Sequence, residues 1–505
     1  MTEPDAGHIA GRREEHPTDR RQHTPSPPPG GRARGADHDR TQPGTPARTG
    51  TRPVRHGAHA VNRVLPHDLI PVVAAALLVL VAAVVGTAVE HRDGTLHVGW
   101  PPLYATWEPH IGAGTPAAVV VAVLIMAYGP PLAARLPWRG LLATVWAAAL
   151  AWTVSLALVD GWEHGVAGRL TTKYEYLRAV DRFHDIPAAL RDFTHHILIG
   201  SPDHWPAHVA GHPPAATLTF VLLDRAGLGG GAWAGALVLV AGTTAAVAVL
   251  IALRTLADET LARRAAPFLV LAPTAVWAGV SADGYYAAVA AWALAFLALA
   301  VTGHRPRVTA LASGLLCGLT AYLSYGLTLI ALIATAVVLL GSRRLPVLPW
   351  LLAGCAVAPL VFTLAGFSWW EAYHLLVERY YQGAGGIRPY GYWVWANLAC
   401  TALVAGPATA AGLRRTVTVL SASAPRPSSW FTAPERRLGL LTLAALLALL
   451  VADLSGMSKA ETERIWLPFI MWLLPACALL PRPRVWLCAQ AALALALNHF
   501  LLTGW

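Results

Sequence analysis

The chain contains repeated apolar runs that are long enough to cross a lipid bilayer. Two examples are LIPVVAAALLVLVAAVVGTAV at 69–89 and GLLATVWAAALAWTVSLALV at 140–159, and a transmembrane helix needs about 20 such residues. Only 13% of the residues are charged, about half of the fraction that soluble proteins carry. Because backbone groups inside a bilayer must bond to one another, such runs fold as helices. We therefore predict an all-α polytopic membrane protein.

The apolar segments predict about thirteen transmembrane helices. They lie at 69–89, 115–135, 139–160, 231–253, 265–281, 284–302, 308–324, 326–341, 346–366, 393–413, 436–454, 465–480 and 485–502.

The charges of the loops predict how these helices are oriented. With the N-terminus in the cytoplasm, the loops on that side include LPWRG, GSRRLP and PRPR, and all are basic, as the positive-inside rule requires. The pattern holds only if residues 213–228 do not cross, and Asp224 and Arg225 make that segment a costly span. We predict there a short helix that dips into the outer leaflet and returns. The protein is then a multi-pass plasma-membrane protein.

The chain divides into three predicted regions. Residues 1–66 are rich in Pro, Gly and Arg and are typical of a disordered tail, here cytoplasmic and able to contact anionic membrane lipids. Residues 67–138 form an additional N-terminal transmembrane hairpin. Residues 139–505 form the main membrane domain, with extracytoplasmic loops at 160–212, 367–392 and 454–464.

Two features of the composition limit the function. The net charge of +10 comes from arginines in short loops between spans, which is an orientation signal and predicts no nucleic-acid partner. The five cysteines all lie in apolar segments without a CxxC pair, so we expect them to be packing residues without disulfides.

The loop 160–212 carries a dense set of ionisable residues. Within it, Ile186, Leu190, Phe193 and Ile197 recur at helical spacing, with charged residues between them. This pattern predicts an amphipathic helix suited to the membrane surface.

Carboxylates at the outer ends of spans are candidate catalytic groups. Asp160 ends one span, and Glu163 follows it one turn later; a carboxylate at a helix–water boundary can accept a proton from a hydroxyl. Asp283 lies beside Tyr285 in a turn predicted on the same face, although Asp-Gly is also ordinary turn chemistry.

Basic and aromatic residues at the same face are candidate donor-binding groups. Lys459 and Arg464 precede an apolar run, where arginine can bind phosphate through two hydrogen bonds or can serve as an interfacial anchor. Arg379 and Tyr380 lie in the aromatic loop 367–392, whose rings suit either an interfacial belt or stacking against sugars.

The stretch DHWPAHVAGHPP at 203–214 spaces His204, His208 and His212 by four residues. Pro206 and Pro213 interrupt the continuous helix that a zinc pair on one face would need. We therefore predict no metal site here and give His212 alone a place at the mouth of a cavity. The sequence identifies no cofactor and leaves a divalent metal ion open.

In their order along the chain, these motifs resemble those of the GT-C membrane glycosyltransferases, in the branch of protein O-mannosyltransferases and aminoarabinose transferases. The resemblance covers roughly residues 140–480. It rests on Asp160 at an outer span end, the PP entry at 213–214, Asp283 in a later external turn, and the ER-aromatic-x-P boundary at Arg464.

The resemblance implies a polyprenyl-phosphate-linked sugar donor and inverting transfer to an envelope glycan, lipid or protein acceptor outside the membrane. It implies that Asp160 is the general base and that Arg464 holds the lipid phosphate. Asp283 matches the second external Asp, and His212 precedes the prolines where relatives carry Lys or another polar residue. Asp160 is followed by Gly161, where the family has an acidic pair, unless Glu163 substitutes. The N-terminal hairpin has no counterpart in the family pattern.

Two other classes of function remain open at this point. A lipid or solute transporter is one, although we find no internal repeat and no charge near the middle of the spans. A non-catalytic scaffold of a cell-envelope complex is the other.

The loop charges generate a first test. Residues 160–212 and 454–464 should face outward, and residues 413–435 should face the cytoplasm. In a variant without native cysteines, Ser421→Cys should react with an impermeant maleimide only after the cells are permeabilised. Labelling of Ser421→Cys in intact cells would contradict this orientation.

Overall fold

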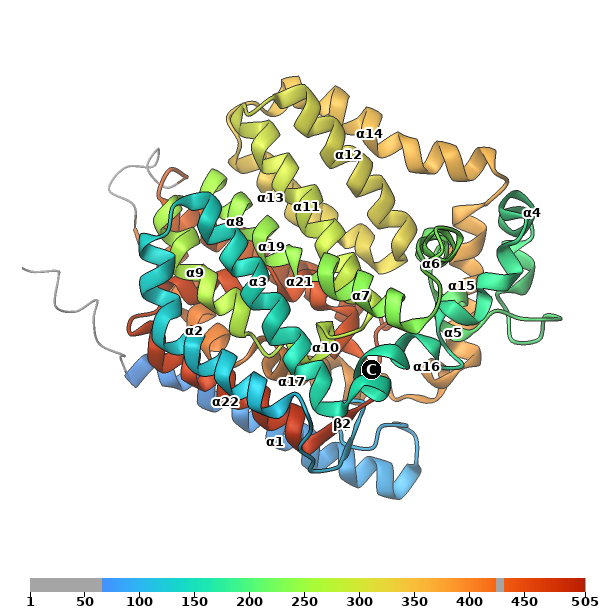
Figure 1. The fold of residues 1–505 in the computed structure, drawn as a ribbon, viewed down its shortest axis with the longest axis horizontal. Coiled ribbons are helices and arrows are strands. Elements are labelled where there is room, and N and C mark those ends of the chain that lie inside the picture. The colour runs from blue at the N-terminus through green and yellow to red at the C-terminus, as the bar shows by residue number, and fades with distance from the viewer. Residues whose placement is uncertain (1–65, 424–430, 505) are drawn as a thin grey trace, which may run out of the picture. The chain divides into compact units, whose positions relative to one another are not determined.

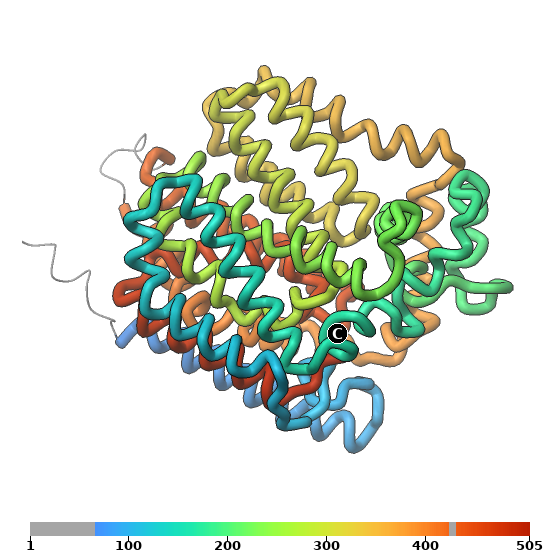
Figure 2. Tube along the Cα trace, viewed as in Figure 1, coloured from blue at the N-terminus to red at the C-terminus, as the bar shows by residue number. Residues whose placement is uncertain are grey.

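The computed structural model describes residues 66–423 and 431–504, and these residues belong to one compact unit, Gly57–Trp505. The tail predicted at 1–66 lies outside the described residues apart from Pro66. Helices dominate the described chain (Figures 1 and 2), so the predicted helical class is confirmed.

Within residues 66–423 and 431–504, seven helical segments are long and apolar enough to cross a membrane. They are α1 (Pro66–Asp93), α2 (Thr115–Arg135), α3 (Trp138–Ala157) with its 3-10 extension Leu158–Asp160, α7 (Gly231–Gly242) continued by α8 (Thr244–Leu256), α11 (Ala282–Thr302), α14 (Arg344–Leu364) and α19 (Pro434–Leu454). An eighth span is formed if α17 (Tyr390–Ala405) and α18 (Pro407–Ser421), bent by 106°, are counted as one.

The predicted number of about thirteen spans is not confirmed. The remaining apolar segments form α9 (Glu259–Leu271), α10 (Ala275–Ala278), α12 (Pro306–Leu323), α13 (Ile330–Leu340), α21 (Leu467–Ile470) and α22 (Pro483–Phe500). Prolines lie at or just beyond the ends of two of these helices, and proline cannot donate the helical hydrogen bond and obstructs the preceding turn. Pro273 follows α9, and Pro475 lies in the 3-10 helix Leu474–Leu479 beyond α21.

The segment predicted to dip into the outer leaflet is a short helix in the structure. Helix α6 (Ala215–Arg225) has 11 residues, which at about 1.5 Å per residue gives roughly 16 Å, about half of the hydrocarbon thickness of a bilayer. Arg225 donates hydrogen bonds to the Phe183 and His184 carbonyls. Its length therefore agrees with a segment that does not cross.

The loop 160–212 folds into short helical turns. They are Glu163–Ala167, Arg169–Thr171, Tyr176–Phe183, α4 (Ile186–Arg191), Phe193–His196 and α5 (Ala207–Gly211). The predicted apolar face is present, but Phe193 packs on Trp205 and on Phe367, which belongs to the loop before α15 (Trp369–Gln382). Since Leu190, Phe193 and Ile197 are buried in the protein, this face is not presented to a membrane surface, and that expectation is corrected.

A two-stranded sheet joins distant parts of the chain. Strand β1 (Ala105–Trp107) pairs antiparallel with β2 (Leu501–Thr503), with Trp107 opposite Leu501, and the Trp107 ring stacks on Phe500 at 5.4 Å. The sequence predicted helices only, and this sheet was not foreseen. It fixes the loop between α1 and α2 beside the end of α22.

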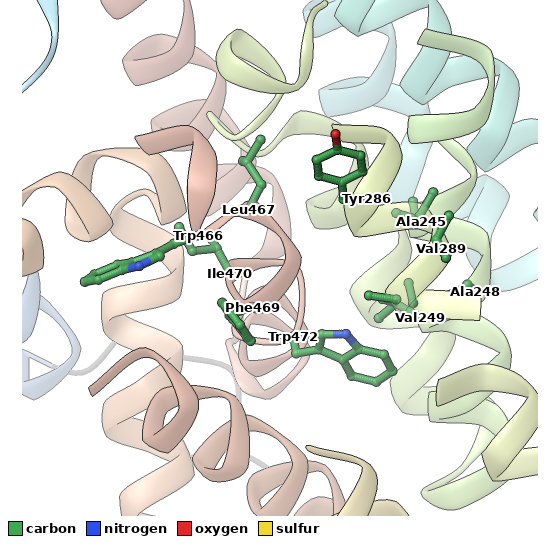
Figure 3. Packing of buried hydrophobic residues seen from close by; sticks show 14 of the residues in the cluster. Ala245, Ala248, Val249, Tyr286, Val289, Trp466, Leu467, Phe469, Ile470 and Trp472 are labelled. Carbon is green, nitrogen blue, oxygen red and sulfur yellow. The ribbon is translucent and has the colours of Figure 1, made fainter. Parts of the chain in front are cut away.

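The apolar core locks the segment after residue 464 against two spans. Figure 3 shows Leu467, Phe469 and Trp472, which follow α20 (Thr462–Ile465), on the side toward Tyr286 and Val289 of α11 and residues of α8, whereas Trp466 points the opposite way. All of these side chains are buried. This packing fixes where α20 lies relative to the start of α11.

Helix α1 is held at its first turn by a buried ion pair. The side chain of Asp68 is fully buried and binds Arg414 at 3.0 Å and Arg415 at 2.7 Å, both from α18. Most other residues of α1 are exposed, as expected of a helix that faces lipid. The ion pair is therefore the strongest polar attachment of α1 to α18.

Replacing Asp68 tests this attachment. Asp68→Ala leaves the Arg414 and Arg415 side chains without their shared carboxylate, and breaking a buried pair costs about 3–5 kcal/mol. We expect a clearly lower melting temperature of the purified protein in detergent. Asp93→Ala, which removes an exposed pair with Arg92 at the other end of α1, should leave it unchanged. Equal melting temperatures for both variants would contradict the role of Asp68.

Candidate active site

Asp160 ends the 3-10 turn that follows α3 and is bound on both carboxylate oxygens. Its Oδ2 accepts a hydrogen bond from Arg169 at 2.7 Å, and its Oδ1 lies 2.8 Å from His110 Nε2. Gly161 follows with φ +83, a conformation that favours glycine, and so turns the chain away from the helix axis. The predicted catalytic carboxylate is thus largely buried and held in one position.

Arg169 connects Asp160 to the C-terminal strand. Its NH1 donates to the Thr503 carbonyl at 2.9 Å, and its side chain is only 8% exposed. Burial lowers the pKa of the Arg169 guanidinium, and Asp160 opposes that effect. Arg169 Nε has no hydrogen-bond partner among the described residues.

Arg464 is the centre of a second buried cluster. It binds Asp283 at 2.5 Å, His208 Nε2 at 2.9 Å and Glu461 at 3.2 Å. Burial alone would lower the pKa of Arg464, but the charges of Asp283 and Glu461 raise it. Helix α11 sets the position of Asp283, because Ser281 caps its first turn and donates to Asp283 Oδ2 at 3.1 Å. Arg464 is therefore a permanent cation between two carboxylates.

The hydrogen bonds of His208 define its tautomer. Arginine can only donate, so His208 Nε2 accepts from Arg464 and the ring is neutral. The proton is then on Nδ1, which donates to Glu175 Oε1 at 2.9 Å. His208 thus bridges Arg464 and Glu175 as a neutral ring.

One small cavity joins the two clusters. It has room for about one water molecule and is lined by Arg169, Glu175, Tyr176, His208, Val280, Ser281, Ala282 and Arg464. Glu175 Oε2, like Arg169 Nε, is a buried polar atom without a hydrogen-bond partner among the described residues. Unsatisfied buried groups of this kind are costly, and both belong to side chains that line the cavity.

The charges around the cavity are balanced. Four carboxylates lie beside four groups that carry or can carry a positive charge. Arg388 pairs with Glu461 at 3.3 Å, and His110 pairs with Asp160. The carboxylates are Asp160, Glu175, Asp283 and Glu461, and the basic groups are Arg169, Arg388, Arg464 and His110. An anion that enters must therefore compete for guanidiniums that already have partners.

The structure gives the cavity position to His208 and not to His212. His212 packs on the Tyr176 and Tyr286 rings at 5.7 and 5.9 Å, and its Nδ1 lies 2.8 Å from the His208 carbonyl. Burial lowers the pKa of His212 to about 4, so it is neutral at pH 7. His204 is exposed, and no group of three residues among those described could hold a metal ion.

Two other candidates lie outside the cavity lining. Glu163 is exposed at the start of its helical turn. Tyr285 is half-buried and packs on Tyr286 at 5.7 Å.

Three predicted donor-binding residues gather next to the cavity without lining it. Lys459 Nζ donates to the Gly385 carbonyl at 2.8 Å, and its backbone N–H donates to Tyr380 Oη at 3.0 Å. Arg379 lies 3.4 Å from the Trp205 carbonyl. Burial lowers the pKa of Lys459. Tyr380 thus links α15 to the loop before α20, and Arg379 links α15 to the segment before α5.

The sequence did not single out five residues of the two clusters. His110, Arg169, Glu175, His208 and Glu461 are ordinary in local context, and His208 was considered only as a metal ligand. Their partners lie far away in sequence: 256 residues separate His208 from Arg464, and 334 separate Arg169 from Thr503. A single local signal pointed to the area, the density of ionisable residues in the loop 160–212.

No family model and no curated protein matches the chain. One similar solved structure is the crystal structure of the Archaeoglobus fulgidus oligosaccharyltransferase in complex with zinc and sulfate. It is 16% identical, with a TM-score of 0.44, and the match covers 70% of this chain and 53% of that one. This chain thus spans about half the length of that protein. At this distance the match supports no conclusion about the activity of this chain or about the role of any of its residues.

Glu463 is a buried carboxyl next to this site. Its Oε1 accepts a hydrogen bond from the Tyr104 backbone at 2.9 Å, and its Oε2 has no partner among the described residues. Burial raises the pKa of Glu463 to about 7. The folded protein therefore binds this proton more tightly than the unfolded chain does, and stability falls as the pH rises from about 4.5 through 7.

Glu463→Gln should remove this pH dependence. The amide resembles the protonated carboxyl, so we expect equal melting temperatures at pH 5 and a more stable variant at pH 8, by up to roughly 3 kcal/mol. Thermal unfolding in detergent at both pH values provides the measurement. Glu378→Gln, at an exposed position, should leave the melting temperature unchanged at both pH values. A variant that is less stable than the wild type at pH 8 would show that Glu463 is needed as a carboxylate.

Proposed function

We propose that this protein is a glycosyltransferase that moves a sugar from a polyprenyl-phosphate donor to an acceptor hydroxyl on the extracytoplasmic face. The observation that carries the proposal is that Arg169, the partner of Asp160, and Arg464, the partner of Asp283, both line one cavity. Such a site offers a carboxylate to deprotonate a hydroxyl and guanidiniums to receive a leaving phosphate.

In the proposed reaction, Asp160 takes the proton of the acceptor hydroxyl. The hydroxyl oxygen attacks the anomeric carbon from the face opposite the phosphate, and the bond from that carbon to the phosphate oxygen breaks. The phosphate leaves with the bonding electrons as an anion. Arg464 stabilises the developing charge, which is the form of electrostatic catalysis that buried cations provide best. Asp283 orients the Arg464 guanidinium and does not react.

The remaining candidates take supporting roles in this proposal. Lys459, Arg379 and Tyr380 hold the donor beside the cavity, and Tyr285 packs near the sugar. His212 is neutral and lies behind His208, so we assign it to packing around the site. Glu163 is exposed and replaces Asp160 as the base only if the test below favours it.

The extracytoplasmic location follows from loop charge and from the chemistry of the donor. Nucleotide sugars are cytoplasmic, so a transferase that acts outside needs an activated sugar that is soluble in the membrane. The acceptor is then an envelope glycan, lipid or protein. Two guanidiniums supply positive charge near the leaving phosphate, and treatment with EDTA tests whether a divalent cation contributes as well. The described residues give the transporter alternative no specific support.

Kinetic signatures of two variants test the proposed roles. Asp160→Asn removes the base, so turnover should fall roughly 10²–10⁴-fold with donor binding almost unchanged. Arg464→Lys keeps the charge but loses the two-pronged hydrogen bonding, so it should mainly raise the KM for the donor. The assay is transfer from a panel of radiolabelled polyprenyl-phosphate hexoses and pentoses in membranes.

Matched variants separate these roles from general damage. Arg178→Lys, at an exposed position, should behave as the wild type. If Glu163→Gln abolishes transfer while Asp160→Asn retains it, Glu163 is the base. Normal transfer by both Asp160→Asn and Arg464→Lys would place the reaction elsewhere.

A further inference from the structure

His110 reaches Asp160 from a part of the chain that the family resemblance does not include. It lies in the segment 94–114 between α1 and α2, three residues after β1. Its backbone N–H donates to the His499 carbonyl at 2.8 Å, which extends the connection made by the β1–β2 pair. Gly112 and Gly114 follow, and a Cβ at either position would collide with the backbone around Val159 or Ser155. The segment therefore lies directly against the end of α3.

Both ring nitrogens of His110 face acceptor oxygens. Nδ1 lies 2.7 Å from the Glu108 carbonyl, which can only accept, so this nitrogen carries a proton. Nε2 lies 2.8 Å from Asp160 Oδ1. A lone pair and a carboxylate would repel each other at that distance, so a proton lies between them. His110 and Asp160 therefore share one proton in this structure.

The other partner of Asp160 cannot exchange protons. Arg169 binds Oδ2, and a guanidinium remains charged at any physiological pH. His208, in the neighbouring cluster, accepts from Arg464 through its Nε2 and is turned away from this role. Of the two side chains that contact Asp160, only His110 is chemically able to take a proton from it. The His110 ring is 20% exposed, so it can also pass a proton to solvent.

We propose that His110 is the proton relay of the active site, which receives from Asp160 the proton that Asp160 removes from the acceptor hydroxyl. This inference rests on the proposed function and names a residue that acts through Asp160 without touching the substrate. It also gives the additional N-terminal region a role in the reaction.

The step balances in protons and charge. In the reacting state the shared proton has been lost to water, so that Asp160 is ionised and His110 is neutral, with Nδ1–H bound to Glu108 and Nε2 able to accept a proton. The acceptor proton moves to Asp160 and then to Nε2, which leaves Asp160 ionised and His110 as an imidazolium. This pairing of an imidazolium with an ionised Asp160 is consistent with the 2.8 Å distance between His110 Nε2 and Asp160 Oδ1. The imidazolium then loses one proton to water, and the pair is ready again.

The surrounding charges determine when this pair is ready. Asp160, Glu108, His164 and Arg169 are the titratable groups that influence or adjoin it. Burial lowers the pKa of His110, but the hydrogen bonds to Glu108 and Asp160 outweigh that effect, and the pKa is raised. A raised pKa means that the proton is kept to higher pH. Turnover should therefore rise with pH along a limb centred above 6.5, the ordinary value for histidine.

Variants of His110 test the relay by kinetics. Glutamine can donate to Asp160 but cannot accept a proton, so His110→Gln should lower kcat roughly 10²-fold, the lower end for a positioned proton transfer. The donor KM should stay unchanged, and the acidic limb should move to lower pH. His110→Ala leaves space for a small base, so added imidazole should restore turnover in proportion to its concentration.

His499 supplies the matched control. It lies at the same corner and bonds Thr115 at 2.9 Å, away from Asp160. His499→Gln should keep the wild-type pH profile, and imidazole should not accelerate His499→Ala. If Asp160→Asn is inactive while His110→Gln keeps normal kcat and pH dependence, the relay is wrong and the proposed function stands. If Asp160→Asn transfers sugar normally, the proposed base is wrong, and the relay falls with it.

A second measurement needs no enzymatic activity. Diethyl pyrocarbonate modifies neutral imidazole, and mass spectrometry of the full chain locates the modified residues. We expect His110 to react with a midpoint at higher pH than the exposed His204, and Asp160→Asn should move that midpoint down. An unchanged midpoint in Asp160→Asn would show that the two residues do not share a proton, which overturns the relay.

Discussion

The burial of one guanidinium constrains much of this structure. Arg464 is 7% exposed at its side chain, and a buried cation without partners costs several kcal/mol. The fold meets this requirement by bringing Asp283 from the start of α11, Glu461 from the turn before α20 and His208 from α5 to a single point. The apolar packing after residue 464 fixes that point, because Leu467 and Trp472 lie on the side toward Tyr286 and Val249 (Figure 3). Packing and charge therefore specify the same arrangement.

The Asp160 cluster is held mainly by backbone carbonyl groups, unlike the Arg464 cluster. Its basic residues are held by backbone contacts with segments that end far from one another in sequence: Arg169 by the Thr503 carbonyl, and His110 by the Glu108 carbonyl. The β1–β2 pair joins those segments. Arg169 of one cluster and Arg464 of the other both line the cavity. The His110 ring is more exposed than the Asp160 side chain that it contacts. In the proposed reaction, this exposure allows the proton taken by Asp160 to reach solvent.

The sequence predicted features that depend on neighbouring residues and missed those that depend on distant ones. Helical class, the short helix at 215–225 and the apolar face at 186–197 follow from composition and periodicity, and all are present. The apolar face turned inward because Trp205 and Phe367 were available to cover it. His212 attracted notice because Pro213 follows it, whereas His208 owes its place to Arg464, 256 residues away. Prolines lie at or beyond the ends of two helices that were expected to be spans, and hydropathy alone does not show where a proline ends a helix.

The balance of charge sets a condition on any donor phosphate. Arg464 already has two carboxylate partners, so a phosphate that binds its guanidinium competes with them. Asp283 is the closer, at 2.5 Å, and is 5% exposed. Glu461 lies at 3.2 Å, is 27% exposed, and has a second cationic partner in Arg388. Losing Arg464 would therefore leave Glu461 paired, whereas it would leave Asp283 buried without a cation. Glu461 is the contact that yields at lower cost, and Asp283 is the one that keeps Arg464 aimed at the cavity while the exchange takes place.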